Sequence, residues 1–450
     1  MSDAAGGGRP LRLLFTAYRG NMRCGGQGIY LWFLARELAR LGHEITVLVG
    51  PPLPDPMPFA REVVEIPDDR FWGKWFVRDW AAFFPAEAPL GVLTPLRFWE
   101  LAASRIGFFP EPFAFSARAF RETARRLRGG ARFDLVHDVQ CLGWGLLGLR
   151  SLGLPVVSTI HHPLTVDRRA SFRRDRSLQE AIGTAEFHPV GMQGCVARHL
   201  DAVLTSTEAG AWVIRQDFGV RAERLHIVGN GLDTELFSPD PALPRDPSTL
   251  LCVGRAADPN KGIPVLIEAL AKLPPPVRLV LVDEDHPLHE GRRLAAALGV
   301  GDRLEITGRV PIEELVRRYR SASLVVVPSL YEGFGLPAAE AMACGTPVVA
   351  SAAGALPEVL RTGGGGTLVA KGDADALARA IAELLARPEE GRRRLGAEAR
   401  ARIVEAYSWP RIAARTAEVY RAALAARRGR PASTITSAHS GTRRATPSST

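Results

Sequence analysis

Cysteine is scarce in this 450-residue chain, and its five cysteines lie far apart with no C-x-x-C pair among them. An odd number of scattered thiols argues against a disulfide framework or a zinc site and favours a reducing compartment. Long apolar runs are also missing, since none approaches the roughly 18 residues that span a bilayer. The apolar stretch after the polar start is too short for a signal peptide, so we expect a cytoplasmic protein.

Charge of one sign is not in large excess either. The chain has 57 Lys+Arg against 48 Asp+Glu, a net charge of +9. Five of the positive charges lie in residues 427–450, a segment with ten Ser/Thr and no acid, which leaves +4 for the rest. A surplus this small argues against a nucleic-acid groove, so no nucleic-acid partner is expected. The polar segment 427–450 is predicted to be disordered, and residues 1–10 to be flexible.

The common nucleotide-binding fingerprints are absent. A glycine loop follows the first apolar run, but after Gly26 and Gly28 the third glycine of G-x-G-x-x-G is replaced by Leu31. The second strand ends at Val49 without the acid that would bind a ribose, and no G-x-x-x-x-G-K-[ST] occurs. These absences argue against an NAD-binding domain and against P-loop phosphoryl transfer.

Strand-like and helix-like patterns alternate along most of the chain. A helix is predicted over 29–41, where apolar residues recur at spacings of three and four, and strands are predicted on both sides of it. Repetition of this unit indicates parallel sheets covered by helices on both faces, and the units are too many for one sheet. The segment 238–248 has four prolines and no apolar periodicity, so it reads as a linker. We therefore expect two Rossmann-like domains, 11–238 and 249–407, joined by residues 239–248 and facing a central cleft.

One segment interrupts this alternation. Residues 71–120 hold 14 of the 33 aromatic residues, which indicates an insertion of about 68–130 in the first domain. One interpretation is that these rings pack helices against that domain. The other is an exposed aromatic lip that meets a lipid or a hydrophobic acceptor.

The strongest chemical signal lies in the second half. Arg255 and Lys261 follow a strand and together can neutralise a diphosphate. Further on, a buried strand leads through a glycine turn into a helix with Pro337 predicted at its first position. Backbone N–H groups at the start of such a helix form an anion site, and we assign these to Phe334, Gly335 and Leu336. Glu332 and Glu340, the latter predicted in the first turn, flank this turn and suit a ligand that also carries hydroxyl groups.

The segment YEGFGLPAAEAMACGTPVVAS, with its E-x7-E pair, resembles the signature of the retaining family-4 glycosyltransferases, which have a GT-B fold. Further matches, spread over about residues 11–425, occur in the same order as in that family: Gly25-Gly26, LARLGHEITVL, HDV, STIHHP, VGNGLD, VGR with KG, and SWPRIA. The resemblance implies an acceptor-binding first domain, a nucleotide-sugar-binding second domain, and a helix over 408–426 that crosses back to the first.

The resemblance also implies roles for individual residues. Arg255 and Lys261 would bind the diphosphate and stabilise the leaving group, and Gly26 would let the loop backbone approach the phosphate. Glu340 would bind the ribose and Glu332 the donor sugar. The first histidine of STIHHP, His161, would face the reacting sugar, in preference to His162. His161, Glu332, Arg255 and Lys261 are thus the predicted catalytic set. His137 is a weaker candidate on the acceptor side. Asn230 and Asp233 are interpreted as structural.

No metal and no further cofactor is expected beside the nucleotide-diphosphate sugar, which is a co-substrate. In the family the leaving phosphate itself is thought to take the acceptor's proton on the same face, so no strong protein nucleophile is expected. The sequence departs from the family at 283–285, where Asp-Glu-Asp replaces a glycine-containing turn. This D-x-D resembles a metal motif of another glycosyltransferase fold, and we interpret it as incidental here. Asp283 or Glu284 is a candidate contact to ribose or base.

The acceptor is expected to be a hydroxyl of a carbohydrate or glycolipid, in cell-envelope or polysaccharide biosynthesis. Arg168 and Arg169 begin a basic cluster, with arginines at 173, 174 and 176, that would contact acceptor phosphate or anionic headgroups at the inner face of the membrane, or simply be solvated. The alternatives are a nucleotide-sugar epimerase or phosphorylase-like relative, and a noncatalytic sugar-nucleotide-binding paralogue. The presence of both cations, Arg255 and Lys261, together with both carboxylates, Glu332 and Glu340, argues against the noncatalytic paralogue.

Overall fold

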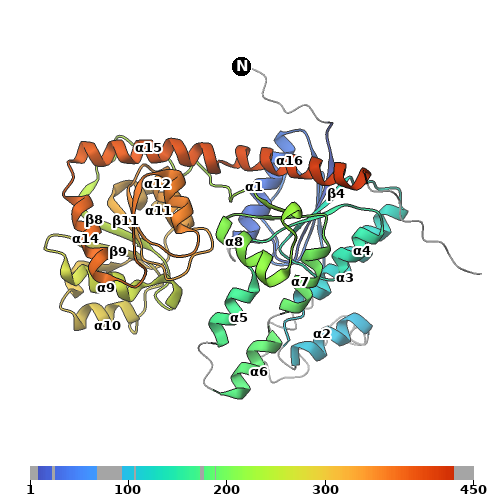
Figure 1. Ribbon diagram of the computed structural model, residues 1–450, viewed down its shortest axis with the longest axis horizontal. Coiled ribbons are helices and arrows are strands. Elements are labelled where there is room, and N and C mark those ends of the chain that lie inside the picture. Colours follow the sequence, from blue (N-terminus) through green and yellow to red (C-terminus); the bar gives the residue numbers. More distant parts are fainter. Residues whose placement is uncertain are drawn as a thin grey trace, which may run out of the picture.

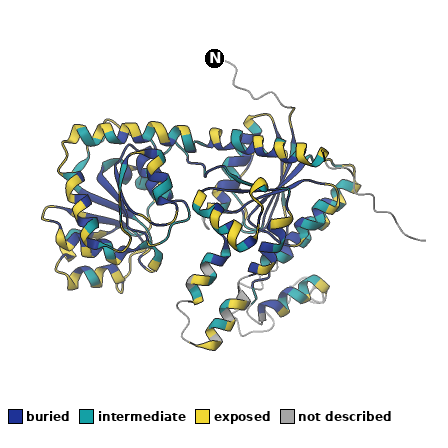
Figure 2. Ribbon diagram, in the orientation of Figure 1, coloured by how far each residue is buried: buried dark blue, intermediate teal, exposed yellow. Residues whose placement is uncertain are grey.

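The computed structural model describes residues 9–22, 26–67, 94–105, 108–172, 177–187 and 189–429. They form two lobes, each built around a parallel β-sheet, and helices α15 (Glu389–Tyr407) and α16 (Trp409–Arg428) run along one side of both (Figure 1). The central strands are buried, whereas the outward faces of the helices are exposed (Figure 2). The predicted α/β fold with two Rossmann-like lobes is confirmed. The expected flexible start, up to residue 8, and the expected disordered tail from 430 lie outside the described residues.

The N-terminal lobe has a seven-stranded sheet in the order β3-β2-β1-β4-β5-β6-β7, in which neighbours pair in parallel. The strands are β1 (Arg12–Ala17), β2 (Glu44–Val49), β3 (Glu62–Glu65), β4 (Leu135–Val139), β5 (Val156–Thr159), β6 (Ala202–Thr205) and β7 (Leu225–Ile227). The order reverses between β1 and β4, where Leu13 lies opposite Leu135. The carboxyl ends of strands at such a reversal form the usual ligand crevice of an open α/β sheet.

The described part of the chain from β1 to β7 also forms helices. They are α1 (Gly26–Arg40), α2 (Pro95–Arg105), α3 (Glu111–Arg128), α4 (Gly145–Ser151), α5 (Leu164–Phe172), α6 (Leu178–Phe187), α7 (Val190–His199) and α8 (Glu208–Val213). The helix predicted over 29–41 begins three residues earlier, at Gly26, because the glycine loop leads directly into it. It ends one residue earlier than predicted, and Gly42 then adopts a φ of 88°, which is the left-handed conformation that favours glycine after a helix.

The C-terminal lobe has a six-stranded parallel sheet in the order β10-β9-β8-β11-β12-β13. Its strands are β8 (Asp246–Val253), β9 (Arg278–Val282), β10 (Leu304–Ile306), β11 (Ala322–Val327), β12 (Val348–Ser351) and β13 (Gly366–Val369). Its helices are α9 (Ile263–Lys272), α10 (Glu290–Ala297), α11 (Ile312–Ser321), α12 (Leu336–Ala343), α13 (Leu356–Gly363) and α14 (Ala374–Leu385). All six residues of β11 are buried, as a central strand with two covered faces requires.

The reversal of strand order in this second sheet falls between β8 and β11. The chain that leaves β8 carries Arg255 and Lys261, and the chain that leaves β11 carries Glu332. Topology alone therefore brings the two cations and this carboxylate to the same edge of the sheet. The linker predicted over 239–248 is shorter than expected, because β8 already begins at Asp246 and pairs there with the start of β11.

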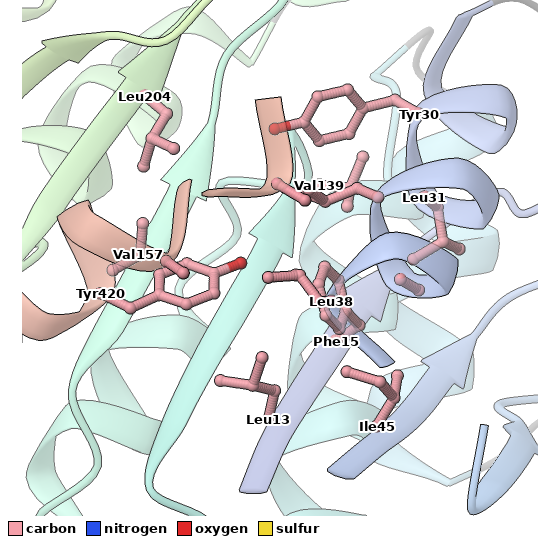
Figure 3. Close-up of a cluster of buried hydrophobic side chains, with 14 of the residues drawn as sticks. Leu13, Phe15, Tyr30, Leu31, Leu38, Ile45, Val139, Val157, Leu204 and Tyr420 are labelled. Atoms are coloured by element: carbon pink, nitrogen blue, oxygen red, sulfur yellow. The ribbon is translucent and has the colours of Figure 1, made fainter. Parts of the chain in front are cut away.

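Helix α16 belongs to the N-terminal lobe by packing, although it is the last described element of the chain. It lies against α1, and Ile412 and Tyr420 are fully buried in the same apolar cluster as residues of β1. Figure 3 shows Tyr420 entering this cluster beside Phe15. The predicted tail also starts later than expected, because Arg427 is still in the helix and donates to the carbonyls of Leu154 and Arg150.

The two lobes are connected by two chain crossings that lie side by side. The Leu232 N–H donates to the Tyr407 carbonyl at 2.7 Å, and Leu232 forms a bridge with Ser408. Next to it, a Cβ on Gly231 would lie 2.1 Å from the Trp409 ring, so no larger residue fits there without movement. The crossings are thus packed closely against each other.

The aromatic insertion is described only in part, since residues 68–93 and 106–107 lie outside the described residues. Within the rest, Phe109 and Phe115 are buried, and Trp99 packs against Phe113 with ring centroids 4.4 Å apart. Phe98 is 57% exposed. The described rings therefore mainly pack helices α2 and α3, as the first interpretation predicted.

Candidate active site

Two connected hollows lie between the lobes and share Lys261, Glu332 and Gly333. The smaller has a volume of about 250 Å³ and is lined on the N-terminal side by His161, Ser206 and Asn230. The larger, of about 410 Å³, is lined by a further set of residues that includes His162, Arg169 and Tyr331. The His162 and Tyr331 rings face each other across the cleft, with centroids 5.8 Å apart. Residues from both lobes thus form one site.

The centre of the site is an ion pair between Lys261 and Glu332, with Nζ 2.9 Å from Oε2. The Ser329 hydroxyl donates to the same oxygen at 3.1 Å, and both charged side chains are mostly buried. Gly262 follows the lysine in a left-handed conformation, with a φ of 63°. A Cβ there would lie 2.1 Å from the Pro328 carbonyl, so only glycine lets the lysine loop approach the end of β11 so closely.

Arg255 lies on the same loop but is exposed, and its guanidinium contacts no partner among the residues that the structure describes. The two cations predicted from the sequence therefore lie at the same edge of the sheet but differ in their contacts. Lys261 is held by a carboxylate, whereas Arg255 is available to an incoming anion.

Helix α12 points its N-terminus into the smaller hollow, which Phe334, Gly335 and Leu336 line together with Pro337. The helix begins at Leu336, so Pro337 is its second residue and not its first as predicted. Gly335 precedes the helix with a φ of 95°, and the Phe334 ring is fixed against Tyr407. In the described part of the chain, the N–H groups of residues 334–336 donate to no backbone or side-chain acceptor. These N–H groups are therefore free to bind an anion, and the anion site stays a prediction.

Glu340 is the fifth residue of α12, so the prediction that it lies in the first turn is wrong. At that distance the helix N-terminus does not offset burial, which raises the pKa of Glu340 to about 7. The Tyr319 hydroxyl donates to Glu340 Oε2 at 2.7 Å and lowers this pKa in part. Tyr319 is itself fully buried at the end of α11, so it holds the carboxylate in one orientation.

His161 follows β5 and faces the C-terminal lobe across the smaller hollow. Its ring contacts the Tyr30 ring of α1 edge to face, with centroids 4.4 Å apart. The Nε2 atom is buried and has no hydrogen-bond partner among the described residues. Burial lowers the pKa of His161 to about 4, so the imidazole is neutral at physiological pH.

Gln140 fixes the backbone of the histidine turn. Its side-chain oxygen accepts the N–H groups of His161 at 2.7 Å and His162 at 3.1 Å, while its amide donates to the His162 carbonyl at 2.6 Å. Gln140 has a φ of 52°, which is unusual for a residue other than glycine. Strained residues that shape a loop often mark functional sites.

His137 does not face an acceptor, so that prediction is wrong. The side chain is fully buried in β4, and its Nε2 and Nδ1 atoms bond the hydroxyls of Thr159, at 2.8 Å, and of Tyr420. Thr159 in turn contacts the Tyr30 hydroxyl at 3.0 Å. This buried chain of polar groups joins α16 to the ring that supports His161. Burial lowers the pKa of His137 to about 3.

The other candidates of the N-terminal lobe are placed as follows. Arg169 lines the larger hollow and pairs with Asp217, whereas Arg168 is half-buried one residue earlier on α5. The arginines at 173, 174 and 176 lie outside the described residues, as does Gly25. Gly26 is the first residue of α1, and a Cβ there would meet nothing within 4 Å, which leaves its surface open to a ligand.

The acidic segment after β9 does not present Asp283 to a ribose or base, so the prediction is wrong for this residue. Asp283 is buried, and its oxygens accept the N–H groups of Ala256, at 2.6 Å, and Glu284, at 2.7 Å. His289 Nε2 lies 2.9 Å from the same carboxylate. Because His289 Nδ1 accepts the Gly291 N–H, Nε2 carries the proton and donates it to Asp283. The pair therefore anchors the backbone next to Arg255. Glu284 pairs with Arg309 instead. Across the described ranges, no group of three or more His, Cys, Asp or Glu side chains is arranged to hold a metal ion.

Four residues of the site went unrecognised in the sequence. Tyr319 and Gln140 act through partners far away in the chain, and Ser206 follows β6 without a distinctive motif. Asn230 lies in the VGNGLD segment and was interpreted as structural, yet it lines the smaller hollow. Asp233 of the same segment does have the structural role, since it accepts the N–H groups at positions 235 and 236.

Comparisons with known proteins agree with this geometry. The family described as Glycosyltransferase Family 4 matches residues 24–236, and the family described as Glycosyl transferases group 1 matches residues 233–402. The chain is 40% identical over 418 residues to the MMP alpha-(1->4)-mannosyltransferase of Mycolicibacterium hassiacum, which covers 92% of this chain and 99% of that protein. It is 31% identical to the D-inositol 3-phosphate glycosyltransferase of Xylanimonas cellulosilytica, over 88% and 91% of the two chains.

Among solved structures, the chain resembles sucrose-phosphate synthase from Thermosynechococcus elongatus, with 27% identity, a TM-score of 0.66, and coverage of 92% of this chain and 100% of that one. It also resembles Anabaena Alr3699/HepE, solved in complex with UDP-glucose, with 22% identity, a TM-score of 0.60 and the same coverage. No helix in the described residues is long and apolar enough to cross a membrane. The chain therefore belongs to glycosyltransferase family 4 and is a glycosyltransferase with two Rossmann-like lobes of the GT-B type.

Proposed function

We propose that this protein transfers a sugar from a nucleotide-diphosphate sugar to a hydroxyl acceptor with retention of anomeric configuration and without a metal ion. The observation that carries the proposal is the Lys261–Glu332 pair at the mouth of an open helix N-terminus, directly opposite His161. A cation, a carboxylate and free N–H groups together suit a ligand with both phosphates and hydroxyls.

The diphosphate is bound by Arg255, Lys261 and the N–H groups at the start of α12. Negative charge develops on the leaving phosphate as the glycosidic bond breaks, and fixed positive groups in a cleft stabilise it. Two side-chain cations and a helix N-terminus supply the positive charge that a divalent cation supplies in other transferases. We therefore expect activity to survive treatment with EDTA.

Donor binding changes the partner of Lys261. In the free protein its ammonium contacts Glu332, with Nζ 2.9 Å from Oε2, and a phosphate oxygen competes for that ammonium when the donor enters. Glu332 then accepts hydroxyl groups of the donor sugar, while Glu340, oriented by Tyr319, accepts those of the ribose. Gly26, at the start of α1, has open space where a Cβ would be and would let the phosphate approach the backbone.

Retention follows from the side on which the acceptor's proton is taken. Among the described residues lining the smaller hollow, Glu332 is the one carboxylate, so no second carboxylate lines it to act as an acid partner. A double displacement requires a free carboxylate about 5 Å from its acid partner on the other face of the sugar. The leaving phosphate therefore deprotonates the acceptor hydroxyl on its own face. Neutral His161 lines the smaller hollow on the side where the reacting sugar would lie.

The relative that shares 40% of its sequence with this chain is a mannosyltransferase, so mannose is the first donor sugar to test. A carbohydrate or glycolipid hydroxyl is the acceptor we propose, in polysaccharide or cell-envelope biosynthesis. The half-buried Arg168 and the Arg169–Asp217 pair border the side on which it would enter. Peripheral contact with anionic membrane is a separate part of the proposal. Sedimentation with anionic vesicles, absent with neutral ones, is the expected result.

A nucleotide-sugar epimerase and a noncatalytic paralogue are the alternatives. None of the named relatives is an epimerase, and a binding scaffold has no need of His161 opposite the ion pair. An epimerase would convert the nucleotide sugar to its isomer without an acceptor, and a scaffold would bind the donor without turnover.

The decisive experiment is a screen of UDP-, GDP- and ADP-sugars by thermal stabilisation, followed by transfer to oligosaccharide acceptors. A donor at a hundredfold excess over Kd should stabilise the protein by about 2.7 kcal/mol. Proton NMR of the first product should show the anomeric configuration of the donor, and inversion would contradict the mechanism.

Lys261→Ala and Glu332→Ala should each abolish transfer while the chain stays folded. Lys272→Ala is the matched control, because it removes a Lys–Asp pair of similar geometry on the outer surface of the C-terminal lobe. Full turnover by both cleft variants would overturn the assignment of this site.

A further inference from the structure

A second cationic hollow lies at the opposite edge of the C-terminal sheet from the active site. A small hollow of about 60 Å³ sits beside the first residues of β8 and β11 and is lined by Arg245 and Ser323. It shares Arg245, Glu389 and Arg393 with a larger groove of about 580 Å³ that follows the linker and the start of α15. Because the active site is at the carboxyl ends of the same strands, the two sites are separate.

Positive charge is concentrated in the small hollow. Arg245, Arg392 and Arg393 line it, and Glu389 is its one carboxylate, which leaves two charges uncompensated. The arginines act on one another through space, since burial and the charges of the other two lower the pKa of Arg245. Arg245 and Arg392 are half-buried, and Arg393 is exposed. Three guanidinium groups around one small space repel each other unless an anion binds between them.

Several hydrogen-bonding groups of the hollow lack partners in the described part of the chain. Ser323 is 3% exposed, and its buried hydroxyl makes no hydrogen bond. Arg393 contacts no acceptor, and Arg245 uses only Nη2, which donates to the carbonyls of Cys344 and Gly345. A buried hydroxyl without a partner costs free energy, so its presence beside the exposed Arg393, which is unpaired among the described residues, points to a missing acceptor.

We propose that this hollow binds the phosphate group of a phosphate monoester, with Arg245, Arg393 and Ser323 as its donors. A volume of about 60 Å³ is larger than one water molecule needs and suits a group of a few heavy atoms. Guanidinium forks and a hydroxyl are the donors that phosphate oxygens prefer. The adjoining groove, lined by polar side chains of both signs, has room for the hydroxylated remainder of a phosphorylated sugar.

The test is isothermal titration with two probes, inorganic phosphate and glucose 6-phosphate. Arg393→Ala should raise the Kd of both about tenfold, because one charge-assisted hydrogen bond is lost. Ser323→Ala should raise it about fivefold without lowering the unfolding temperature, since it also removes an unsatisfied buried hydroxyl. Tighter binding of glucose 6-phosphate shows that the groove binds the sugar, and equal affinity identifies phosphate alone as the ligand.

Two controls locate the binding. Arg379→Ala removes an exposed arginine of α14 outside the hollow and should leave both Kd values unchanged. Lys261→Ala removes a cation of the active-site cleft, so binding that persists in this variant lies outside the cleft. The proposal is overturned if neither probe binds at millimolar concentration, if Arg379→Ala weakens binding as much as Arg393→Ala, or if only Lys261→Ala abolishes it.

Discussion

Replacing Glu340 by glutamine is expected to stabilise the free protein while weakening donor binding. Burial raises the pKa of Glu340 from its ordinary value of 4.5 to about 7, against a smaller lowering by the Tyr319 hydroxyl. A carboxyl whose pKa is raised by folding supports stability while it is protonated. That support is lost as the pH rises through about 7. An amide is always neutral, and its oxygen still accepts the hydrogen bond from Tyr319.

The magnitude follows from the pKa difference. At about 1.4 kcal/mol per pKa unit, ionising Glu340 in the folded state costs up to about 3 kcal/mol above pH 7. At pH 5 the cost is below about 1 kcal/mol, because the carboxyl is then mostly protonated in the folded protein. Donor binding has the opposite dependence if the ionised carboxylate accepts the ribose hydroxyls. Between pH 8 and pH 6 the affinity of the unmodified protein should fall about tenfold.

Urea unfolding at pH 5 and pH 8 and donor titration at pH 6 and pH 8 measure both effects. Glu340→Gln should be more stable than the unmodified protein by up to about 3 kcal/mol at pH 8 and nearly equal to it at pH 5. Its donor affinity should be lower and no longer change between pH 6 and pH 8. Glu405→Gln, an exposed change on α15, serves as the control. A variant that is less stable at pH 8 would refute the reasoning.

Three further changes test the N-terminal lobe and the crossings. Gln140→Ala releases the backbone of the His161 turn and should lower kcat at least about tenfold with donor Kd nearly unchanged, whereas a change in Kd alone would contradict its role. Folding lowers the pKa of His137 from 6.5 to about 3. The neutral side chain therefore contributes its full share of the unfolding free energy above pH 6.5, and this share is lost as the pH falls. The expected loss at pH 4.5 is about 3 kcal/mol. In urea unfolding, the free energy of unfolding of His137→Gln should fall by about 3 kcal/mol less than that of the unmodified protein between pH 6.5 and pH 4.5. Gly231→Ala puts a methyl group 2.1 Å from the Trp409 ring and should destabilise the protein by about 1–3 kcal/mol, seen as a lower unfolding midpoint.

The arrangement of the proposed donor site was predictable because it depends on local sequence and on topology. Arg255 and Lys261 follow one strand and Glu332 follows another, and a parallel sheet with reversed order brings such ends together. The helix with the open N-terminus was also predictable from its glycines and proline. Its exact start was not, since Leu336 and Pro337 both fit the first turn and Gly335 decides between them through its positive φ.

The contacts that orient these groups were not predictable, because they join positions far apart in the chain. Tyr319 reaches Glu340 from another helix, and Gln140 reaches His161 from another strand. His137 shows the converse error. A histidine at the carboxyl end of a strand has the position of a functional residue, and only the packing of Tyr420 from α16 shows that it is buried. Apolar periodicity predicts which face of a helix or strand is buried, but it does not predict which distant residue packs on that face.

The place of α16 in the structure has a consequence for the order in which the protein is made. The cluster around β1 includes Ile412 and Tyr420, so the first lobe to emerge from the ribosome lacks part of its interior until the last described helix is synthesised. The strands of the second lobe all precede α16 in the chain, so its sheet is complete before α16 is synthesised. The lobe that begins the chain is therefore the one that finishes folding last, and a ribosome stalled before residue 409 holds an N-terminal lobe with an exposed apolar face.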